Sequence, residues 1–235
     1  MGLAWLVLPT YNEAANIEAF VDAVRAKLPA SSRILIVDDN SPDGTGEIAD
    51  RLAAQCGAVA VLHRPRKEGL GPAYVAGFRR ALAEGAELVL EMDADFSHDP
   101  AYLPRLLDAA QRADLVLGSR YVDGGGVSEW TALRRAISRG GGAYARLVLG
   151  VGVRDLTGGF KCFRRGVLEA IDLDSIQARG YAFQVEMTYR ALRRGFDVVE
   201  VPIVFRDRRA GSSKMGLAIA AEAAWRVPAL RFKRL

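Results

Sequence analysis

Runs of apolar residues alternate along the chain with segments in which apolar residues recur at every third or fourth position. Continuous apolar runs lie at 3–8 and 34–37, and mostly apolar segments lie at 58–63, 88–92 and 114–118; each has the length of a strand that is buried on both faces. Helical spacing follows the first run, with Ile17, Phe20, Val21, Val24 and Leu28, and recurs near 72–84 and 101–112. This order of strands and helices predicts an α/β fold with a mostly parallel sheet and helices on both faces.

The pattern is less regular after residue 120. A glycine-rich loop precedes a basic segment, 134–153, that becomes apolar, and LTGGFKCFRRGVL at 156–168 reads as a turn leading into a short element. A helix near 182–194 and a strand at 198–205 follow, and 206–216 has the composition of a mobile loop. Because neither a repeat nor a linker divides the sequence, we expect one domain over residues 1–235.

Polar residues gather where the predicted strands end. They are Pro9, Tyr11 and Glu13 after the first strand, Asp38 and Asp39 after the second, Asp93 and Asp95 after the fourth, and Ser119 and Arg120 after the fifth. Carboxyl ends of parallel strands meet at one edge of the sheet, so we expect these loops to form one site. Asp93 and Asp95 also need a positive partner near the core, which leaves a metal ion, an arginine or exposure to water.

The amino-acid composition limits which binding partners and which cellular location are expected. Lys and Arg number 32 against 28 Asp and Glu, and the net charge of +4 is spread in pairs, which weakly favours an anionic partner and does not indicate nucleic acid. Cys56 and Cys162 lie in no metal-binding or disulfide pattern, so a reducing, cytoplasmic location is expected. No segment has the roughly 18 uninterrupted apolar residues of a membrane helix, so membrane contact should be peripheral.

Two kinds of phosphate chemistry remain for the acidic pair. The P-loop and the G-x-G-x-x-G fingerprint are both missing. Asp93, Asp95 and Ser97 are similar to the D-x-D-x-[ST] of aspartate-nucleophile phosphatases, but they follow the fourth strand and no second acidic strand end comes after them. The alternative is a nucleotide-sugar site, where carboxylates hold Mg²⁺ or Mn²⁺ against a diphosphate and Asp39 accepts hydrogen bonds from a base.

Eight blocks, in order, resemble the inverting family-2 glycosyltransferases, most closely the members that attach mannose to polyprenol (dolichol) phosphates. The blocks are LPTYNE, VDDNSPDGT, DADFSHDP, GSRY, DLTGGF, GYAFQVEM, VPIVFRDR and GSSK, between about residues 6 and 216. The resemblance implies a Rossmann-like nucleotide-diphospho-sugar transferase domain of the GT-A type. It also implies GDP-mannose as donor, a polyprenyl phosphate as acceptor, and a β-linked mannosyl phosphate as product.

The same resemblance implies roles for individual residues. Its donor-site residues are Pro9, Tyr11, Glu13, Val37, Asp39, Asp93, Ala94, Asp95, Arg208 and Lys214. The implied divalent metal, Mg²⁺ or Mn²⁺, is held by Asp95 with Asp93 and Ser97, although some relatives carry glutamine at the position of Ser97. Its acceptor-phosphate residues are Arg120, Arg134 and Ser138, and its catalytic residues are Asp95, Arg120, Arg134 and Lys214.

Plainer interpretations stay open for several of these residues. Glu13 could cap the helix that follows it, Arg134 could lie on a solvated helix face, and Gln184 and Glu186 could only brace the site. Two rival functions are compatible with the same fold. One is a transferase that uses another donor, such as UDP-glucose, and the other is a non-catalytic scaffold on a membrane surface. A scaffold would be expected to lose Asp95, Arg120 or Lys214.

Membrane contact is expected through two segments. Basic and aromatic residues at 130–149 and 217–235 suit the cytoplasmic face of a membrane. They would hold the protein there by interfacial contact or through a membrane-anchored partner protein.

Overall fold

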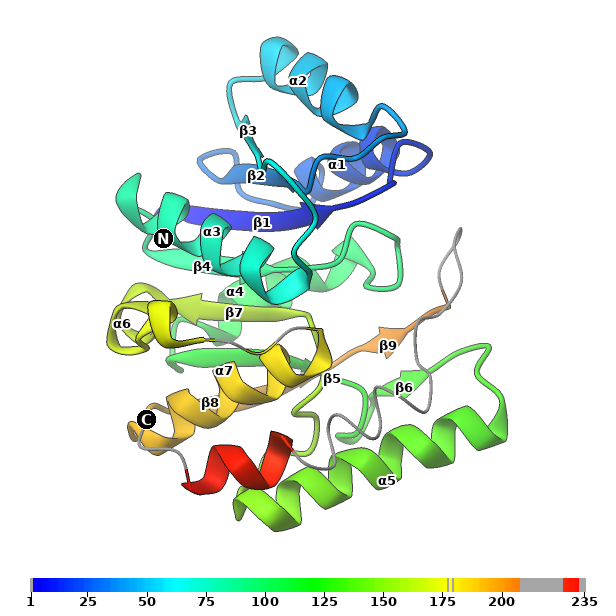
Figure 1. The fold of residues 1–235 in the computed structure, drawn as a ribbon, viewed down its shortest axis with the longest axis vertical. Helices are drawn as coiled ribbons and strands as arrows, with labels where there is room; N and C mark the ends of the chain where they lie inside the picture. The colour runs from blue at the N-terminus through cyan, green and yellow to red at the C-terminus, as the bar shows by residue number, and fades with distance from the viewer. Residues whose placement is uncertain (1, 177, 179, 208–225, 233–235) are drawn as a thin grey trace.

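A seven-stranded sheet forms the centre of the molecule (Figure 1). The computed structural model describes residues 2–176, 178, 180–207 and 226–232. The strands of the main sheet are β1 (Ala4–Thr10), β2 (Arg33–Asp38), β3 (Val59–His63), β4 (Leu88–Glu91), β5 (Leu115–Ser119), β7 (Lys161–Arg164) and β8 (Val198–Pro202). The helices are α1 (Ile17–Arg25), α2 (Thr45–Gln55), α3 (Leu70–Ala83), α4 (Leu103–Ala109), α5 (Ala132–Leu149), α6 (Arg165–Ala170) and α7 (Tyr181–Arg193). Short 3₁₀ turns cover Pro100–Tyr102 and Leu173–Ser175, and a further helix covers residues 226–232.

The strands lie in the order β3-β2-β1-β4-β7-β5-β8. β1 pairs in parallel with β2 and β4, and β5 pairs in parallel with β8. Only β7 is antiparallel to its neighbours β4 and β5, so the predicted mostly parallel sheet is confirmed. We predicted no more than a short element at β7, and its insertion between the fourth and fifth strands was not expected.

Alternate residues of each buried strand face two separate cores, as both-face burial requires. Trp5 and Val7 of β1 pack with α3, α7 and the end of α5, whereas Leu6 and Leu8 pack with α1, α2 and α4. In Figure 1, α3 and α7 cross the sheet on the side toward the viewer. The predicted helices on both faces are therefore confirmed.

Two elements differ from the prediction. The strand predicted at 198–205 is interrupted at Ile203, after which β9 (Val204–Phe205) pairs with β6 (Gly126–Val127) in a small second sheet. The helix predicted over 101–112 is divided into a 3₁₀ turn and α4, because Asp99 caps the turn by accepting a hydrogen bond from Ala101 N and Pro104 follows at the start of α4. Such interruptions depend on local caps that a hydrophobic period does not record.

The basic segment with three consecutive glycines is a helix, α5, of 18 residues. Thr131 caps its first turn by accepting a hydrogen bond from Arg134 N, and Gly150 ends it with φ at 69°. Gly142 is buried, but a Cβ there would meet only Arg154 O, at 3.9 Å, and a Cβ at Gly140 or Gly141 would meet nothing within 4 Å, so a close approach does not require these glycines. The helix propensity of glycine is low, and tertiary packing overrides it here.

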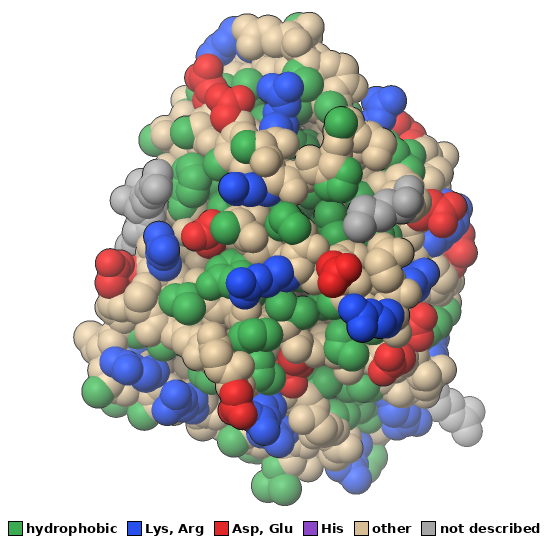
Figure 2. Space-filling view, turned by 180° about the vertical axis from the view of Figure 1, so that it is seen from behind, with side chains coloured by type: hydrophobic (Ala, Val, Ile, Leu, Met, Phe, Trp, Pro, Cys, Tyr) green, Lys and Arg blue, Asp and Glu red, His purple; other side chains and the backbone are tan. Residues whose placement is uncertain are grey.

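The exposed apolar surface is concentrated on two helices. Among the described residues, every large hydrophobic side chain that is exposed lies on α5 or on the helix at 226–232; these are Leu133, Ile137, Tyr144, Leu147 and Phe232. Figure 2 shows the molecule from behind, with blue basic and green apolar atoms alternating along its lower edge, where Figure 1 has these two helices. No helix in the described part of the chain has the length and hydropathy needed to cross a bilayer.

Candidate functional site

One edge of the sheet collects the loops that we predicted would converge. β1, β2, β4 and β5 are mutually parallel, so their carboxyl ends lie on the same side. β7 runs the other way, so the turn that precedes it, 155–160, lies at this edge as well. The sequence therefore predicted the edge correctly and missed the loop that β7 contributes.

Asp39, beyond the end of β2, is buried and already holds an arginine. Arg64 Nη1 donates to Asp39 Oδ1, and the backbone N–H of Glu68 donates to Oδ2 at 3.4 Å. Arg64 is itself nearly buried and also bonds Glu68 at 2.7 Å. Near the end of β1, the Nζ of Lys67 lies 3.5 Å from the ring centroid of Tyr11. Asp39 and Tyr11, which are expected at the nucleoside, are thus both in contact with basic side chains. One of these, Arg64, is a residue for which we had predicted no role.

Other predicted donor residues contribute in different ways. Pro9 and Val37 are paired in the β1–β2 register, and the Val37 side chain is fully buried, where it faces Gly77 of α3. Glu13 Oε2 accepts a hydrogen bond from Asn16 Nδ2 at 3.0 Å, and its carbonyl accepts from the backbone N–H of Asn16 and Ile17. The interpretation of Glu13 as a local support for the start of α1 therefore has direct geometric backing.

The loop after β4 presents three oxygen-bearing side chains. Asp93 Oδ1 accepts a hydrogen bond from Tyr74 Oη at 3.3 Å, and Asp95 Oδ1 accepts from Ser97 N at 3.0 Å. Burial, together with the charges of Asp93 and Glu91, raises the pKa of Tyr74 well above its usual range, so this phenol remains a donor. Ala94 is buried between the two aspartates.

These oxygens suit a hard divalent cation. Ser97 Oγ is fully buried and has no hydrogen-bond partner among the described residues, which is the condition expected of an oxygen reserved for a ligand. Carboxylate and hydroxyl oxygens are the ligand type that Mg²⁺ and Mn²⁺ take. The described residues contain no group of three His, Cys, Asp or Glu side chains arranged for a metal, so further ligands would have to come from a bound molecule or from water.

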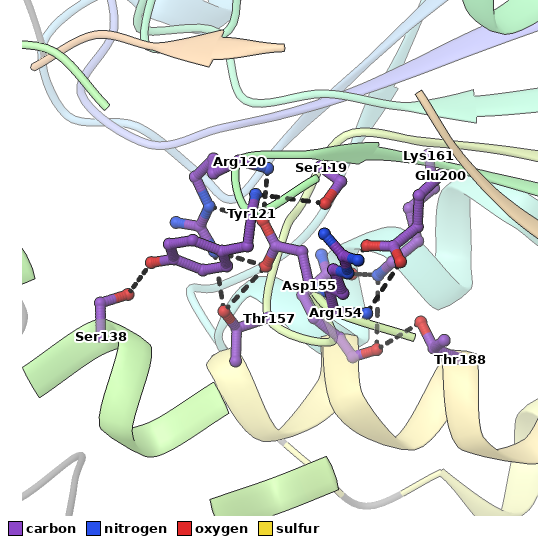
Figure 3. A network of polar contacts seen from close by, with 11 residues as sticks. Ser119, Arg120, Tyr121, Ser138, Arg154, Asp155, Thr157, Lys161, Thr188 and Glu200 are labelled. Atoms are coloured by element: carbon purple, nitrogen blue, oxygen red, sulfur yellow. Dashed lines mark hydrogen bonds and ion pairs between the residues drawn. The ribbon is translucent and has the colours of Figure 1, made fainter. Parts of the chain in front are cut away.

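Arg120, after β5, is fixed by a buried carboxylate that we did not predict (Figure 3). Asp155 accepts from Arg120 Nε and Nη2, both at 2.7 Å, and from the Arg120 backbone N–H at 3.0 Å. Thr157 Oγ1 accepts from Nη2 at 2.8 Å. Burial alone would raise the pKa of Asp155, but the charge and hydrogen bonds of Arg120 outweigh it and lower that pKa.

The three residues predicted for the acceptor phosphate, Arg120, Arg134 and Ser138, lie around a cluster of aromatic rings that includes Trp130 and Tyr121. The guanidinium carbons of Arg134 and Arg120 lie 4.2 and 5.8 Å from the centroid of Trp130. Arg134 Nη1 is 3.0 Å from Asp207 Oδ2. Tyr121 Oη and Ser138 Oγ are hydrogen-bonded at 2.6 Å (Figure 3).

The same cluster reaches the acidic loop after β4. The ring of Phe205 lies 5.5 Å from Trp130 and 5.1 Å from His98, in edge contact with both. His98 is therefore buried among aromatic rings. Arg206 N donates to the carbonyl of Ser97 at 3.0 Å. Arg208 and Lys214 lie outside the described residues.

A buried ionic group beneath the site was also missed. Lys161 Nζ lies 3.0 Å from Glu91 Oε1, and both side chains are fully buried. Burial lowers the pKa of Lys161 and raises that of Glu91, while each charge opposes the shift of the other. The only sequence signal was a charged residue inside each of the apolar runs LVLEM and FKCF.

Replacing Asp155 with Asn should lower the free energy of unfolding at pH 7 by about 3–5 kcal/mol, because it leaves Arg120 buried without a counter-charge. The folded pKa of Asp155 is depressed below its usual 3.8, so its contribution is present above that value and is lost as the pH falls through the folded pKa. Urea unfolding of both proteins should therefore show a gap that is wide at pH 7 and narrows below about pH 4. A gap that stays constant down to pH 3 would contradict this role.

Comparison with known proteins identifies the family of this chain. The sequence profile described as "Glycosyl transferase family 2" matches residues 5–172. The chain is 49% identical over 217 residues to an undecaprenyl-phosphate mannosyltransferase of Micrococcus luteus, covering 92% of this chain and 89% of that protein. It is also 49% identical over 224 residues to a polyprenol monophosphomannose synthase of Mycolicibacterium smegmatis, covering 94% and 84%.

Solved structures support the fold. Glucosyl-3-phosphoglycerate synthase from Mycobacterium tuberculosis, solved with Mn²⁺, UDP and glucosyl-3-phosphoglycerate, has a TM-score of 0.67 and 20% identity and covers 97% of this chain and 78% of its own. A second mycobacterial protein of known structure has a TM-score of 0.70 at 20% identity, over 97% of this chain and 73% of its own. The fold is therefore that of the GT-A glycosyltransferases, and the profile match with the two 49% relatives shows that this chain belongs to glycosyl transferase family 2.

Proposed function

We propose that this glycosyltransferase moves mannose from GDP-mannose to a polyprenyl phosphate, with inversion at the anomeric carbon. The observation that carries the proposal is the contact chain from the Asp93–Ser97 loop through His98, Phe205 and Trp130 to Arg120 and Arg134. It joins an acidic loop suited to a metal and diphosphate to a basic cluster suited to a second phosphate. The names of the two relatives that are 49% identical supply the mannose and the polyprenyl acceptor.

The donor diphosphate would lie against the loop after β4. Asp95, Asp93 and Ser97 would hold Mg²⁺ or Mn²⁺, and a structural neighbour has been solved with Mn²⁺ and UDP. A divalent metal, when bound, neutralises charge on the departing diphosphate. Tyr74 keeps Asp93 oriented, and Arg208 and Lys214, which stay predictions, would add positive charge on the same group.

The nucleoside would lie beyond the ends of β1 and β2. Pro9, Tyr11, Glu13, Val37, Asp39 and Ala94 stay predicted contacts there. Arg64 holds the Asp39 side chain in one orientation, which prepares its oxygens to accept N–H groups of a purine base. Val37 is fully buried and would have to contribute through its backbone.

The acceptor phosphate would enter beside Trp130. Arg120 is buried with its Nε and Nη2 bound by Asp155, so it would act mainly through its charge, whereas Arg134 is 23% exposed and lies nearer to solvent. A phosphate monoester is ionised near neutral pH, with a second pKa of about 6, so it needs no general base to attack the anomeric carbon. Positioning and charge neutralisation would supply most of the rate, and attack opposite the leaving group would invert the centre.

The protein would work as a peripheral enzyme on the cytoplasmic face of a membrane, where the acceptor lipid lies. On α5, Leu133, Ile137, Tyr144 and Leu147 are spaced by four, seven and three residues, so they form one stripe. The helix at 226–232 adds the exposed Phe232 beside it, because Arg231 Nη1 donates to the carbonyl of Val148. Exposed arginines flank the stripe, and a basic helix with an apolar face suits anionic lipid.

Removing the metal should stop transfer. With radiolabelled GDP-mannose and a short polyprenyl phosphate, EDTA should abolish the lipid-bound label and Mg²⁺ or Mn²⁺ should restore it. Asp95→Ala should cost about 10²-fold or more in kcat, with metal no longer restoring the rate. An unchanged metal response in Asp95→Ala would remove this residue from the metal site, and label transfer from UDP-glucose instead would contradict the donor.

Arg134→Ala should weaken the acceptor and spare the donor. A charge-assisted contact to phosphate is worth about 1.5–3 kcal/mol, so KM for polyprenyl phosphate should rise by roughly 10- to 100-fold. The affinity for GDP-mannose, measured by calorimetry without acceptor, should barely change. Arg134→Lys should recover only part of the loss because it lacks the planar guanidinium. Arg112→Ala, at an exposed position in the turn after α4, is the matched control, and equal weakening of donor and acceptor would move Arg134 to the donor side.

Membrane binding should depend on the apolar stripe. Leu133→Glu and Leu147→Glu should each weaken binding to anionic phosphatidylglycerol vesicles by about tenfold or more, because burying a leucine side chain is worth roughly 1.5–3 kcal/mol. Vesicle co-sedimentation measures this, and GDP binding in solution should be unchanged. Ala54→Glu on the exposed surface of α2 adds the same charge elsewhere and should have little effect. Equal losses in all three variants would indicate charge repulsion alone.

A further inference from the structure

Gln184 lies in the first turn of α7 and is 2% exposed. Lys161 Nζ donates to its backbone carbonyl at 3.3 Å and also to its side-chain Oε1. An ammonium group can only donate, so the amide oxygen must be the atom that faces Lys161. The orientation of the amide is thereby determined, and its NH₂ group points away from the ammonium.

The NH₂ group is only partly satisfied. A hydrogen bond from the Gln184 amide lowers the pKa of Glu91, whose Oε2 is buried as well. Gln184 Nε2 is buried and has no other hydrogen-bond partner among the described residues. An amide nitrogen carries two hydrogens, so the bond to Glu91 leaves one N–H to be satisfied. A buried donor without a partner is costly, which favours a bound ligand as its acceptor.

Gly159 keeps a small gap open beside this donor. A Cβ at Gly159 would lie 3.3 Å from Gln184 Nε2 and 3.8 Å from Asp93 Oδ2. The φ angle of Gly159 is not positive, so the missing side chain provides space and not an unusual backbone conformation. Gly159 and Asp93 are both partly exposed, so the gap opens toward the strand-end edge where the donor would bind.

The gap has a donor on one side and an acceptor on the other. A hydroxyl group can accept from the amide N–H and donate to the carboxylate at once, whereas an ionised phosphate oxygen can only accept and would leave the Asp93 oxygen without a donor. We infer that Gln184 is a specificity-determining residue that donates a hydrogen bond to one hydroxyl of the donor sugar, with Asp93 accepting from the same hydroxyl. The inference rests on the proposed function for the identity of that sugar.

The test uses GDP-mannose analogues that each lack one hydroxyl, at C2, C3, C4 or C6. With the wild-type protein, one analogue should lose about tenfold in kcat/KM relative to GDP-mannose, as expected for one lost hydrogen bond to a buried group. In Gln184→Met, GDP-mannose should fall to the level of that analogue, and the penalty for the missing hydroxyl should shrink to about twofold or less. Affinity for GDP alone should be unchanged.

Gln184→Glu is the second variant because it keeps an oxygen toward Lys161 and replaces the amide donor with a second carboxylate oxygen, which also adds a negative charge beside Glu91. It should show the same loss of discrimination, and thermal unfolding of both variants reports any loss of bracing. Gln111→Met is the matched control, since Gln111 donates to Leu107 O on α4 at a distance from the edge. It should discriminate among the analogues as the wild type does.

Two outcomes would overturn the inference. The first is a variant that loses stability or GDP affinity but keeps the full penalty for every missing hydroxyl, which would make Gln184 a bracing residue only. The second is a wild-type protein with no penalty for any analogue. If the wild type uses UDP-glucose and not GDP-mannose, the donor assignment fails separately, and the same comparison with deoxy analogues of UDP-glucose decides the role of Gln184.

Discussion

The fully buried ammonium of Lys161, on a strand in the interior of the sheet, constrains the rest of the site. Its charge must be matched inside the core, and Glu91 and the oxygens of Gln184 do so. The Glu91–Lys161 pairing fixes the register of β7, because a slip of one residue would turn Lys161 to the other face of the sheet. The turn before β7 and the start of α7 are therefore held at the edge where Asp93 lies.

The sequence was most informative where burial follows a simple period. Continuous apolar runs predicted the parallel strands, and their polar ends predicted that Asp39, Asp93 and Arg120 share one edge. β7 was missed because it has four residues, two of them basic, and a buried lysine reads as a solvated one when its partner is 70 residues away. Asp155 was missed for the same reason, since 35 residues separate it from Arg120.

Arginine at the site serves two different physical purposes. Arg120 is nearly inaccessible, and Asp155 accepts hydrogen bonds from its Nε and Nη2. Arg120 therefore provides a fixed charge in a low-dielectric environment. Arg134 pairs with a partly exposed Asp207 and stacks on Trp130, an arrangement that leaves it near solvent. Sequence reasoning could not separate these roles, because it left Arg134 open between a solvated helix face and a phosphate ligand. Packing against Trp130 shows that a wholly solvated helix face is the wrong description.

In the proposed function, the strand-end edge aligns a mannosyl donor and a lipid phosphate on opposite sides of the anomeric carbon. Incubating the protein with GDP-mannose labelled with ¹³C at C1, a polyprenyl phosphate and a divalent metal tests this alignment. The one-bond C–H coupling at C1 of the lipid product is then measured by NMR. We expect a mannosyl phosphate with β configuration, while an α-linked product, or label that never enters the lipid, would contradict the proposed alignment.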